Sequence, residues 1–344
     1  MRRRFLIMPV TLLVSLSLPA SEPSTQEWDY IVWINEVLKG PERHLENYHF
    51  IPQSNILSRV KEPNQHFLAY IQTVEPQAHP AEVPTQQEMG RIKEAISLLP
   101  LLHKRIINDR VIEICFIENL GSSGWTDWVI DDHGDLYCVV AFDQQTLSMD
   151  LSQWLESREN TCFDGVSEET KIRIEAGTEY SGFYGILLHE MTHVIDVVLN
   201  ITPFVELSLY ALALKQGKVI KDSSPFIDNV WEGPYTPTAS YNFALRDSVT
   251  FYRPVGNRKL MVQDAAIVFD QLAATPFASL FACQSWAEDL AELVLFYHLT
   301  QKLDQPYTIS VKKGTDVIYS YRPMGNPMVA ERFPLLDMFY DSEN

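Results

Sequence analysis

The chain has 344 residues, of which 46% are hydrophobic, and its formal net charge at pH 7 is −18. This composition excludes a disordered or fibrous protein, and the length allows about two domains or subdomains with a sizeable core. The negative charge argues against nucleic acid or an anionic lipid surface as a partner, because like charges repel. A protein substrate would more naturally be neutral or basic near the binding cleft.

The first 20 residues have the pattern of an export signal. Residues 2–4 are arginines, an apolar stretch follows at Phe5–Leu18, and Ala20 fits the last residue before cleavage. The apolar stretch has only 14 residues and contains Pro9, which is short for a helix that crosses a bilayer. We therefore expect an exported protein, periplasmic or secreted, with no membrane span once residues 1–20 are removed.

Residues 21–110 are expected to form a mainly helical region. The predicted elements are a helix at 27–40, a Pro- and Gln-rich loop at 75–87 and a second helix at 87–100. The stripe expected to be buried on the first helix consists of Trp28, Ile31, Val32 and Leu38. This region could be a propeptide, an accessory domain or part of the main scaffold, and we favour an integral accessory region.

Two β-branched and aromatic-rich runs, 111–120 and 135–143, predict strands of a small sheet. The residues between them, 121–135, contain turn-forming glycine and aspartate. An exposed edge strand of such a sheet could accept an extended peptide by backbone pairing. His133 lies in the polar turn and is expected at the surface rather than at a metal.

The chain after residue 200 is expected to be mainly helical. Helices are predicted at 205–218 and 261–273. The segment between them, 222–257, is irregular and rich in Pro and aromatic residues, and loops of this length are usually functional or wrap the surface. The alternating character after Leu303 predicts a terminal hairpin.

Disulfide bonds are possible in an exported protein that has an even number of cysteines. The four cysteines are Cys115, Cys138, Cys162 and Cys283. Cys115 and Cys138 lie in the two predicted strands, so they could pair if those strands are neighbours. None has the CxxC spacing, which argues against a metal site made of cysteines.

The most informative stretch is 182–200, with the motif His189-Glu190-x-x-His193 at its centre. Residues four apart share a helix face, so the two histidines can bind one ion, and neutral imidazoles suit Zn²⁺. Glu190 would lie beside the ion and could take a proton from a metal-bound water. The surrounding apolar residues recur at helical spacing and predict a buried helix, in which these polar groups need a shared partner. The alternative is a chance pattern on an amphipathic helix.

A catalytic zinc site requires a third protein ligand and one open position for water. Glu288 and Glu292 are four apart on a predicted helix at 285–298, so they share a face and either can supply the ligand. Ser285 and Glu288 also form the pattern of a capping box, and Glu292 would then be the better ligand. Glu206 is nearer in sequence but belongs to no motif.

The pattern HExxHxxD, followed downstream by ExxAE, resembles the gluzincins, particularly the lethal-factor-like branch of zinc metallopeptidases. The resemblance covers these two helices. It implies a Zn²⁺ ion held by His189, His193 and Glu288. It also places Glu292 and Asp196 where carboxylates orient the ligating histidines.

Gluzincins commonly stabilise the tetrahedral oxyanion with a Tyr or His beside the metal. The side chains available in the corresponding part of this sequence are Tyr241, Tyr252, His298 and Arg246. We favour Tyr252 or Tyr241, and no motif decides between them.

The resemblance predicts an α+β fold with a zincin-like catalytic unit at 111–344. A small sheet and the motif helix would form its upper part, and the residues after 200 a mainly helical lower part. The expected function is that of an exported zinc-dependent peptidase with Glu190 as general base and a peptide or protein as substrate. The alternatives are an exported zinc-binding protein without hydrolytic activity, and a zinc amidase acting on cell-wall or small-molecule amides.

Overall fold

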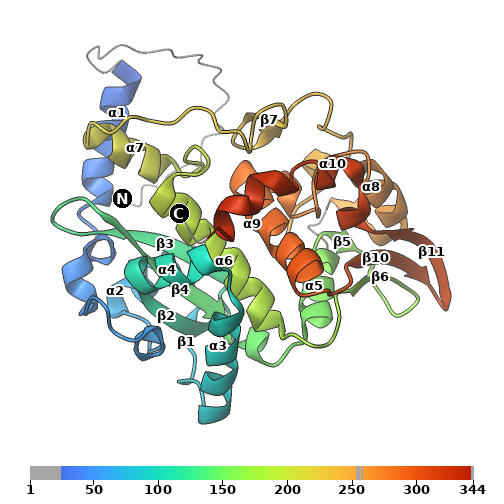
Figure 1. Cartoon of the computed structure of the whole chain (residues 1–344), viewed down its shortest axis with the longest axis horizontal. Coiled ribbons are helices and arrows are strands. Elements are labelled where there is room, and N and C mark those ends of the chain that lie inside the picture. Colours follow the sequence, from blue (N-terminus) through green and yellow to red (C-terminus); the bar gives the residue numbers. More distant parts are fainter. Residues whose placement is uncertain (1–24, 253–255, 257–258, 342–344) are drawn as a thin grey trace.

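The computed structural model of the chain describes residues 25–252, 256 and 259–341 (Figure 1). The predicted export signal, residues 1–20, lies outside this part. None of the described helices has the length and hydropathy needed to cross a membrane. The fold is α+β, as predicted, with several small sheets.

A four-stranded sheet forms one side of the molecule, with the strand order β1-β2-β4-β3. Its strands are β1 (His79–Pro80), β2 (Val111–Glu118), β3 (Gly124–Ile130) and β4 (Leu136–Asp143). The pair β2–β4 is parallel, whereas β1 and β3 pair antiparallel with their neighbours. The sequence predicted β2 and β4, but it did not predict β3, which lies in the stretch expected to separate them. This missed strand is the last one of the sheet, beside the motif helix.

The motif helix α6 (Gly182–Leu199) is buried between the sheet and α9 (Trp286–Tyr297) (Figure 1). It begins at Ser181, whose side chain accepts a hydrogen bond from the Tyr184 amide, and it ends at Asn200 in the left-handed conformation. Helix α5 (Leu151–Asn160) packs against it so closely that a Cβ on Gly185 would lie 2.7 Å from Trp154. Glycine is therefore required here by the close contact of the two helices.

The residues before the sheet pack against the rest of the molecule through helices. These are α1 (Thr25–Val37), α2 (Gln65–Val74), α3 (Gln86–Leu98) and α4 (Leu101–Arg110). Helices α3 and α4 contact α6, and α1 contacts α7 (Leu207–Lys215). The predicted stripe of α1 is wrong at Trp28 and Val32, which are 53% and 62% exposed, whereas Leu38 packs against the cluster around Ile34. The buried side chain is Ile34, since this is the face that meets α7.

The remaining strands and α-helices all follow α5 in the chain. They are β5 (Phe163–Asp164), β6 (Thr170–Glu175), β7 (Trp231–Gly233), β8 (Thr236–Pro237), β9 (Leu260–Met261), α8 (Ala265–Leu272), β10 (Thr308–Lys313), β11 (Asp316–Tyr321) and α10 (Pro327–Ala330). The predicted terminal hairpin is confirmed as β10–β11, and it gains β6 as a third strand. The predicted helices at 205–218 and 261–273 are confirmed as the shorter helices α7 and α8.

The cysteines form no disulfide in this structure, although all four lie in the described part of the chain. Strands β2 and β4 are indeed neighbours, but Cys115 lies opposite Ala141 and Cys138 lies opposite Val111. The two side chains also belong to different hydrophobic clusters, on the two faces of the sheet. The strands are therefore neighbours, but the possible pairing of Cys115 with Cys138 does not occur, because the two residues are not opposite each other and their side chains point to different faces of the sheet.

The C-terminal segment is fixed to α9 by a buried ion pair. The guanidinium of Arg332 donates to both carboxylate oxygens of Asp289, at 2.9 and 2.7 Å. Trp231 donates its indole N–H to the same carboxylate at 2.9 Å. Both charged side chains are at least 94% buried, so the cost of burying each charge is compensated by its ion pair with the other.

We expect Arg332→Met to lower the free energy of unfolding by about 3–5 kcal/mol, because Asp289 would remain buried without its partner. The matched control is Lys39→Met, which breaks the exposed pair Lys39–Glu36 and should cost less than about 1 kcal/mol. Urea denaturation of the three proteins measures both values. Equal losses in the two variants would contradict the proposed role of Arg332.

Candidate metal centre

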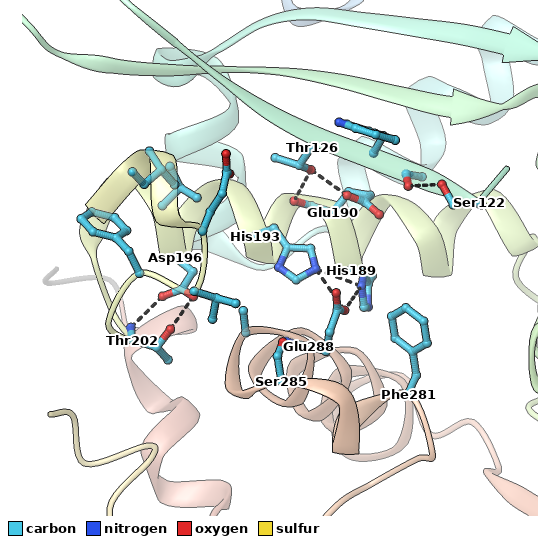
Figure 2. Close-up of a pocket in the computed structure, with 18 of the residues that line it drawn as sticks. Ser122, Thr126, His189, Glu190, His193, Asp196, Thr202, Phe281, Ser285 and Glu288 are labelled. Carbon is cyan, nitrogen blue, oxygen red and sulfur yellow. Dashed lines mark hydrogen bonds and ion pairs between the residues drawn. The ribbon is translucent and has the colours of Figure 1, made fainter. Parts of the chain in front are cut away.

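Three side-chain atoms converge between α6 and α9 (Figure 2). Nε2 of His189 lies 3.1 Å from Nε2 of His193 and 3.1 Å from Oε2 of Glu288, and the third edge, from His193 to Glu288, is 3.3 Å. Ligand atoms at roughly 2.0–2.1 Å from a tetrahedral zinc ion lie about 3.3 Å from one another. The three edges therefore have the size that a shared zinc ion requires.

The two helices place these ligands in different ways. The histidines are four residues apart on α6, and Glu288 stands in the first turn of α9. The Ser285 hydroxyl caps α9 by accepting from the Glu288 amide at 3.2 Å, but the Glu288 carboxylate points to the histidines. The capping-box alternative thus accounts for the Glu288 backbone and not for its side chain.

Glu292, the alternative third ligand, lies behind His189 instead. Its Oε1 is 2.9 Å from Nδ1 of His189, on the opposite side of the ring from the convergence point. Arg158 of α5 donates to both its oxygens at 2.7 and 2.6 Å, and Ser279 donates at 2.6 Å. Burial alone would raise the pKa of Glu292, but the Arg158 charge and the contact with His189 outweigh it and lower the pKa to about 2. Glu292 is therefore an ionised carboxylate that orients His189.

The electrostatics of the triad favour a cation. Burial works against a charged imidazole, but Glu288 and Glu292 together raise the pKa of His189 to about 10. The two histidines likewise hold the pKa of Glu288 well below its ordinary range. Oε2 of Glu288 is buried and makes no well-formed hydrogen bond with a described residue. A carboxylate and two imidazoles in this arrangement fit a divalent metal, which would replace the protons on the nitrogens.

Glu190 points away from Glu288, towards strand β3 (Figure 2). Its Oε2 accepts a hydrogen bond of 2.7 Å from the Thr126 hydroxyl. A Cβ on Gly124 would lie 2.5 Å from Oε1 of Glu190, so the strand leaves room for this carboxylate only because residue 124 is glycine. Glu190 is thus held beside the triad without belonging to it.

The two tyrosines favoured from the sequence lie in different places. Tyr252 lines the same cavity as the triad, and its hydroxyl is 3.1 Å from that of Ser123, which also accepts from the Trp154 indole. Its φ of 56° is unusual for a residue other than glycine, and burial raises its pKa to about 12, so the phenol keeps its proton. Tyr241 packs against the core and does not line this cavity.

The other sequence candidates are engaged elsewhere. His298 lies 3.2 Å from the Leu98 carbonyl oxygen, and Arg246 donates to the Cys283 carbonyl. Neither lines the cavity. Asp196 does line it, but its two oxygens accept from the Thr202 amide and hydroxyl, at 2.7 Å each. Its hydrogen bonds therefore fix the loop after α6. The sequence resemblance placed Asp196 where a carboxylate orients a ligating histidine, and the charge of His193 does act on Asp196.

The cavity around the triad has a volume of about 490 Å³ and extends beyond the predicted residues. Sequence reasoning missed Thr126, Tyr235 and Phe281 in its lining, as well as Arg158 behind Glu292. None of them belongs to a motif, so no local signal identified them. Glu206, the weakest candidate for the third ligand, is also in the lining, but it does not belong to the converging group.

Comparisons of the chain with protein-family models, with curated proteins and with solved structures found no match. What the site can do is therefore inferred from the geometry of its side chains. Among the described residues, the group able to hold a metal contains three side chains, which leaves one position of a tetrahedral ion open for water or substrate. A structural zinc site would instead be closed by a fourth ligand.

We expect the chain from residue 21 onward to bind about one zinc per molecule, measured by elemental analysis after dialysis. Glu288→Ala should abolish this binding because it removes a ligand. Glu292→Ala should weaken zinc binding about 10- to 100-fold, since it removes only the group that orients His189. Glu206→Gln serves as the matched control and should retain full occupancy. If Glu292→Ala removes the metal and Glu288→Ala does not, Glu292 is the third ligand and Glu288 is not.

Proposed function

We propose that the protein is a zinc-dependent peptidase of the gluzincin type. The observation that carries the proposal is the arrangement of His189, His193 and Glu288 around one point, with Glu190 beside them but outside the ligand group. A structural ion has no use for an adjacent carboxylate, whereas hydrolysis requires a base at this place. An open cavity beside the triad gives a substrate access to it.

In this mechanism a zinc ion bound to the triad would polarise the scissile carbonyl and lower the pKa of the attacking water. Glu190 accepts the proton of that water and later delivers it to the leaving amine. The hydrogen bond from Thr126 holds the carboxylate in position for both transfers. Tyr252 is a protonated phenol in the same cavity and is suited to donate a hydrogen bond to the oxyanion.

Strand β3 offers a backbone surface for an extended substrate. Gly124, Trp125 and Thr126 line the cavity, and β3 is the terminal strand of its sheet. On its outer edge an isolated bridge joins Ile130 to His44, at the end of the strand away from these residues. A peptide that pairs with the beginning of β3 would pass directly over Glu190 and the triad.

We further propose that the enzyme acts after export. This part rests on the sequence of residues 1–20, which has the charge and length of a cleaved signal. The acidic character of the chain agrees with a peptide or protein substrate rather than a nucleic acid.

The test of the proposed function is peptide hydrolysis by the zinc-loaded chain, followed by mass spectrometry of a degenerate peptide mixture. We expect cleavage by the wild type, and a loss of about 10²- to 10⁴-fold in kcat for Glu190→Gln with the zinc content unchanged. A chelator should abolish the wild-type activity. Zinc binding without hydrolysis of any peptide would favour the binding-protein alternative, and activity restricted to non-peptide amides would favour the amidase.

The same assay decides which tyrosine acts on the oxyanion. Tyr252→Phe should lower kcat by about 10²- to 10³-fold, because a donor in the cavity is lost, with little change in KM. Tyr241→Phe is the matched control and should have the activity of the wild type, since Tyr241 lies outside the cavity. Equal activity of both variants would exclude Tyr252 as the donor.

A further inference from the structure

The cavity beside the triad continues past the end of α6 and reaches Glu206. Its wall in this direction is apolar and is formed by Val197, Pro203, Phe204, Val205 and Leu209. Glu206 stands immediately before α7, at the far end of this wall, and its side chain is exposed. A charged group beside an apolar cavity wall is a typical arrangement for selecting a ligand.

The wall is held rigidly by hydrogen bonds from three directions. Asp196 binds both donors of Thr202, and the Trp286 indole donates to the Pro203 carbonyl at 2.8 Å. Lys221 donates to the carbonyls of Asn200 and Ile201, at 2.8 and 2.9 Å. Through its hydrogen bonds to Thr202, Asp196 thus helps to shape this wall of the cavity.

The Glu206 carboxylate is fixed in orientation. Its Oε1 accepts from the indole of Trp128 at 3.0 Å and from the hydroxyl of Ser208. Within the described part of the chain, the side-chain hydrogen bonds of Glu206 involve only this oxygen. Oε2 is thus available for a ligand while the side chain is held in place.

Glu206 is also the residue common to two cavities. The second cavity, of about 430 Å³, is also lined by Glu36, which is paired with Lys39, and by Glu42, which lies 3.8 Å from Arg43. The cation in that lining, Arg43, is buried and paired with Asp127. The four carboxylates of Glu36, Glu42, Asp127 and Glu206 still outnumber the two cations, Lys39 and Arg43, so the local field is negative and a group that binds at Glu206 should be a cation.

An aromatic ring faces the same end of the cavity. Tyr235, in the β7–β8 turn, is 57% exposed and lines the cavity with Glu206. Glu288 of the triad lines the same cavity, and besides burial the charges of Glu206 and Glu288 both raise the pKa of Tyr235. The turn is fixed by the Trp286 amide, which donates to the Pro234 carbonyl. An aromatic face at this position attracts a cation.

We propose that this end of the cavity is a subsite for a long basic side chain, lysine or arginine, of the peptide substrate, and that Glu206 selects it. The proposal rests on the proposed peptidase function. The apolar wall accepts the aliphatic stem of such a side chain, and the carboxylate binds its charged head. A neutral side chain adds no partner for Oε2 of Glu206, and an acidic one is repelled.

The experiment first locates the subsite by digesting a degenerate peptide mixture. The subsite corresponds to the position, counted from the cleaved bond, at which lysine and arginine are enriched in the products. Matched peptides with lysine, norleucine or glutamate at that position are then compared by kcat/KM. We expect lysine to exceed norleucine by about 10-fold or more, because the bond to a charged group is lost. Glu206→Gln should bring the ratio near one while keeping an acceptor for Trp128 and Ser208, and Glu206→Lys should favour glutamate. Glu36→Gln, which alters only the second cavity, should keep the wild-type ratio.

A binding measurement keeps the subsite testable without hydrolysis. NMR titration of the zinc-loaded Glu190→Gln protein with Nα-acetyl-lysine amide and Nα-acetyl-norleucine amide should show tighter binding of the lysine compound. The difference should vanish when Glu206→Gln is added. Selective binding of the lysine compound without cleavage of any peptide would support the subsite and contradict the proposed peptidase function. The subsite is overturned if peptides are cleaved with no basic preference, if Glu206→Gln keeps the preference, or if both amides bind alike.

Discussion

The site depends on one buried ion pair, between Arg158 of α5 and Glu292 of α9. Neither side chain is more than 3% exposed, so neither charge could be buried alone. The pair ties the two helices that flank α6, and the same carboxylate contacts Nδ1 of His189. Because Glu292 is already engaged by Arg158 and Ser279, the carboxylate one turn earlier, Glu288, is the one that faces the histidines. The Arg158 guanidinium of α5 thus determines that Glu292 contacts Nδ1 of His189 while Glu288 faces both histidines.

Helix α6 presents different chemistry on its different sides. The histidines face α9, Glu190 faces β3, and Asp196 near the C-terminal end fixes the loop that leads to Glu206. A helix buried along most of its length can do this because its neighbours are themselves rigid and supply specific partners. The two candidate histidine ligands, the proposed base and the residue that fixes the loop towards Glu206 therefore share one rigid support, α6. Their relative positions are set by the geometry of a single helix rather than by separate mobile loops.

The strongly periodic elements could be predicted from the sequence, and so could the motif residues on them. Helices α6 and α9 and the β10–β11 hairpin follow from local spacing alone. Strand β3 was missed because it lies between Gly- and Asp-rich turns, and the buried face of α1 was wrong because tertiary packing on α7 decides it. Arg158 is 134 residues from its partner Glu292, and Tyr252 lies in irregular chain, so periodicity contains no information about either. What could not be predicted is the set of partners that only the folded chain brings together.

The buried cysteines have a practical consequence. Burial raises the pKa of Cys115, Cys138 and Cys283 above the ordinary value, and Cys162 is fully buried as well. The reactive thiolate is therefore suppressed and shielded in the native state, and the fold does not rely on oxidation of its sulfurs. A thiol-specific reagent would react with these groups when the surrounding core opens. The cysteines lie in the sheet, in the loop after α5 and in the segment before α9, so their rate of reaction with such a reagent would report global unfolding.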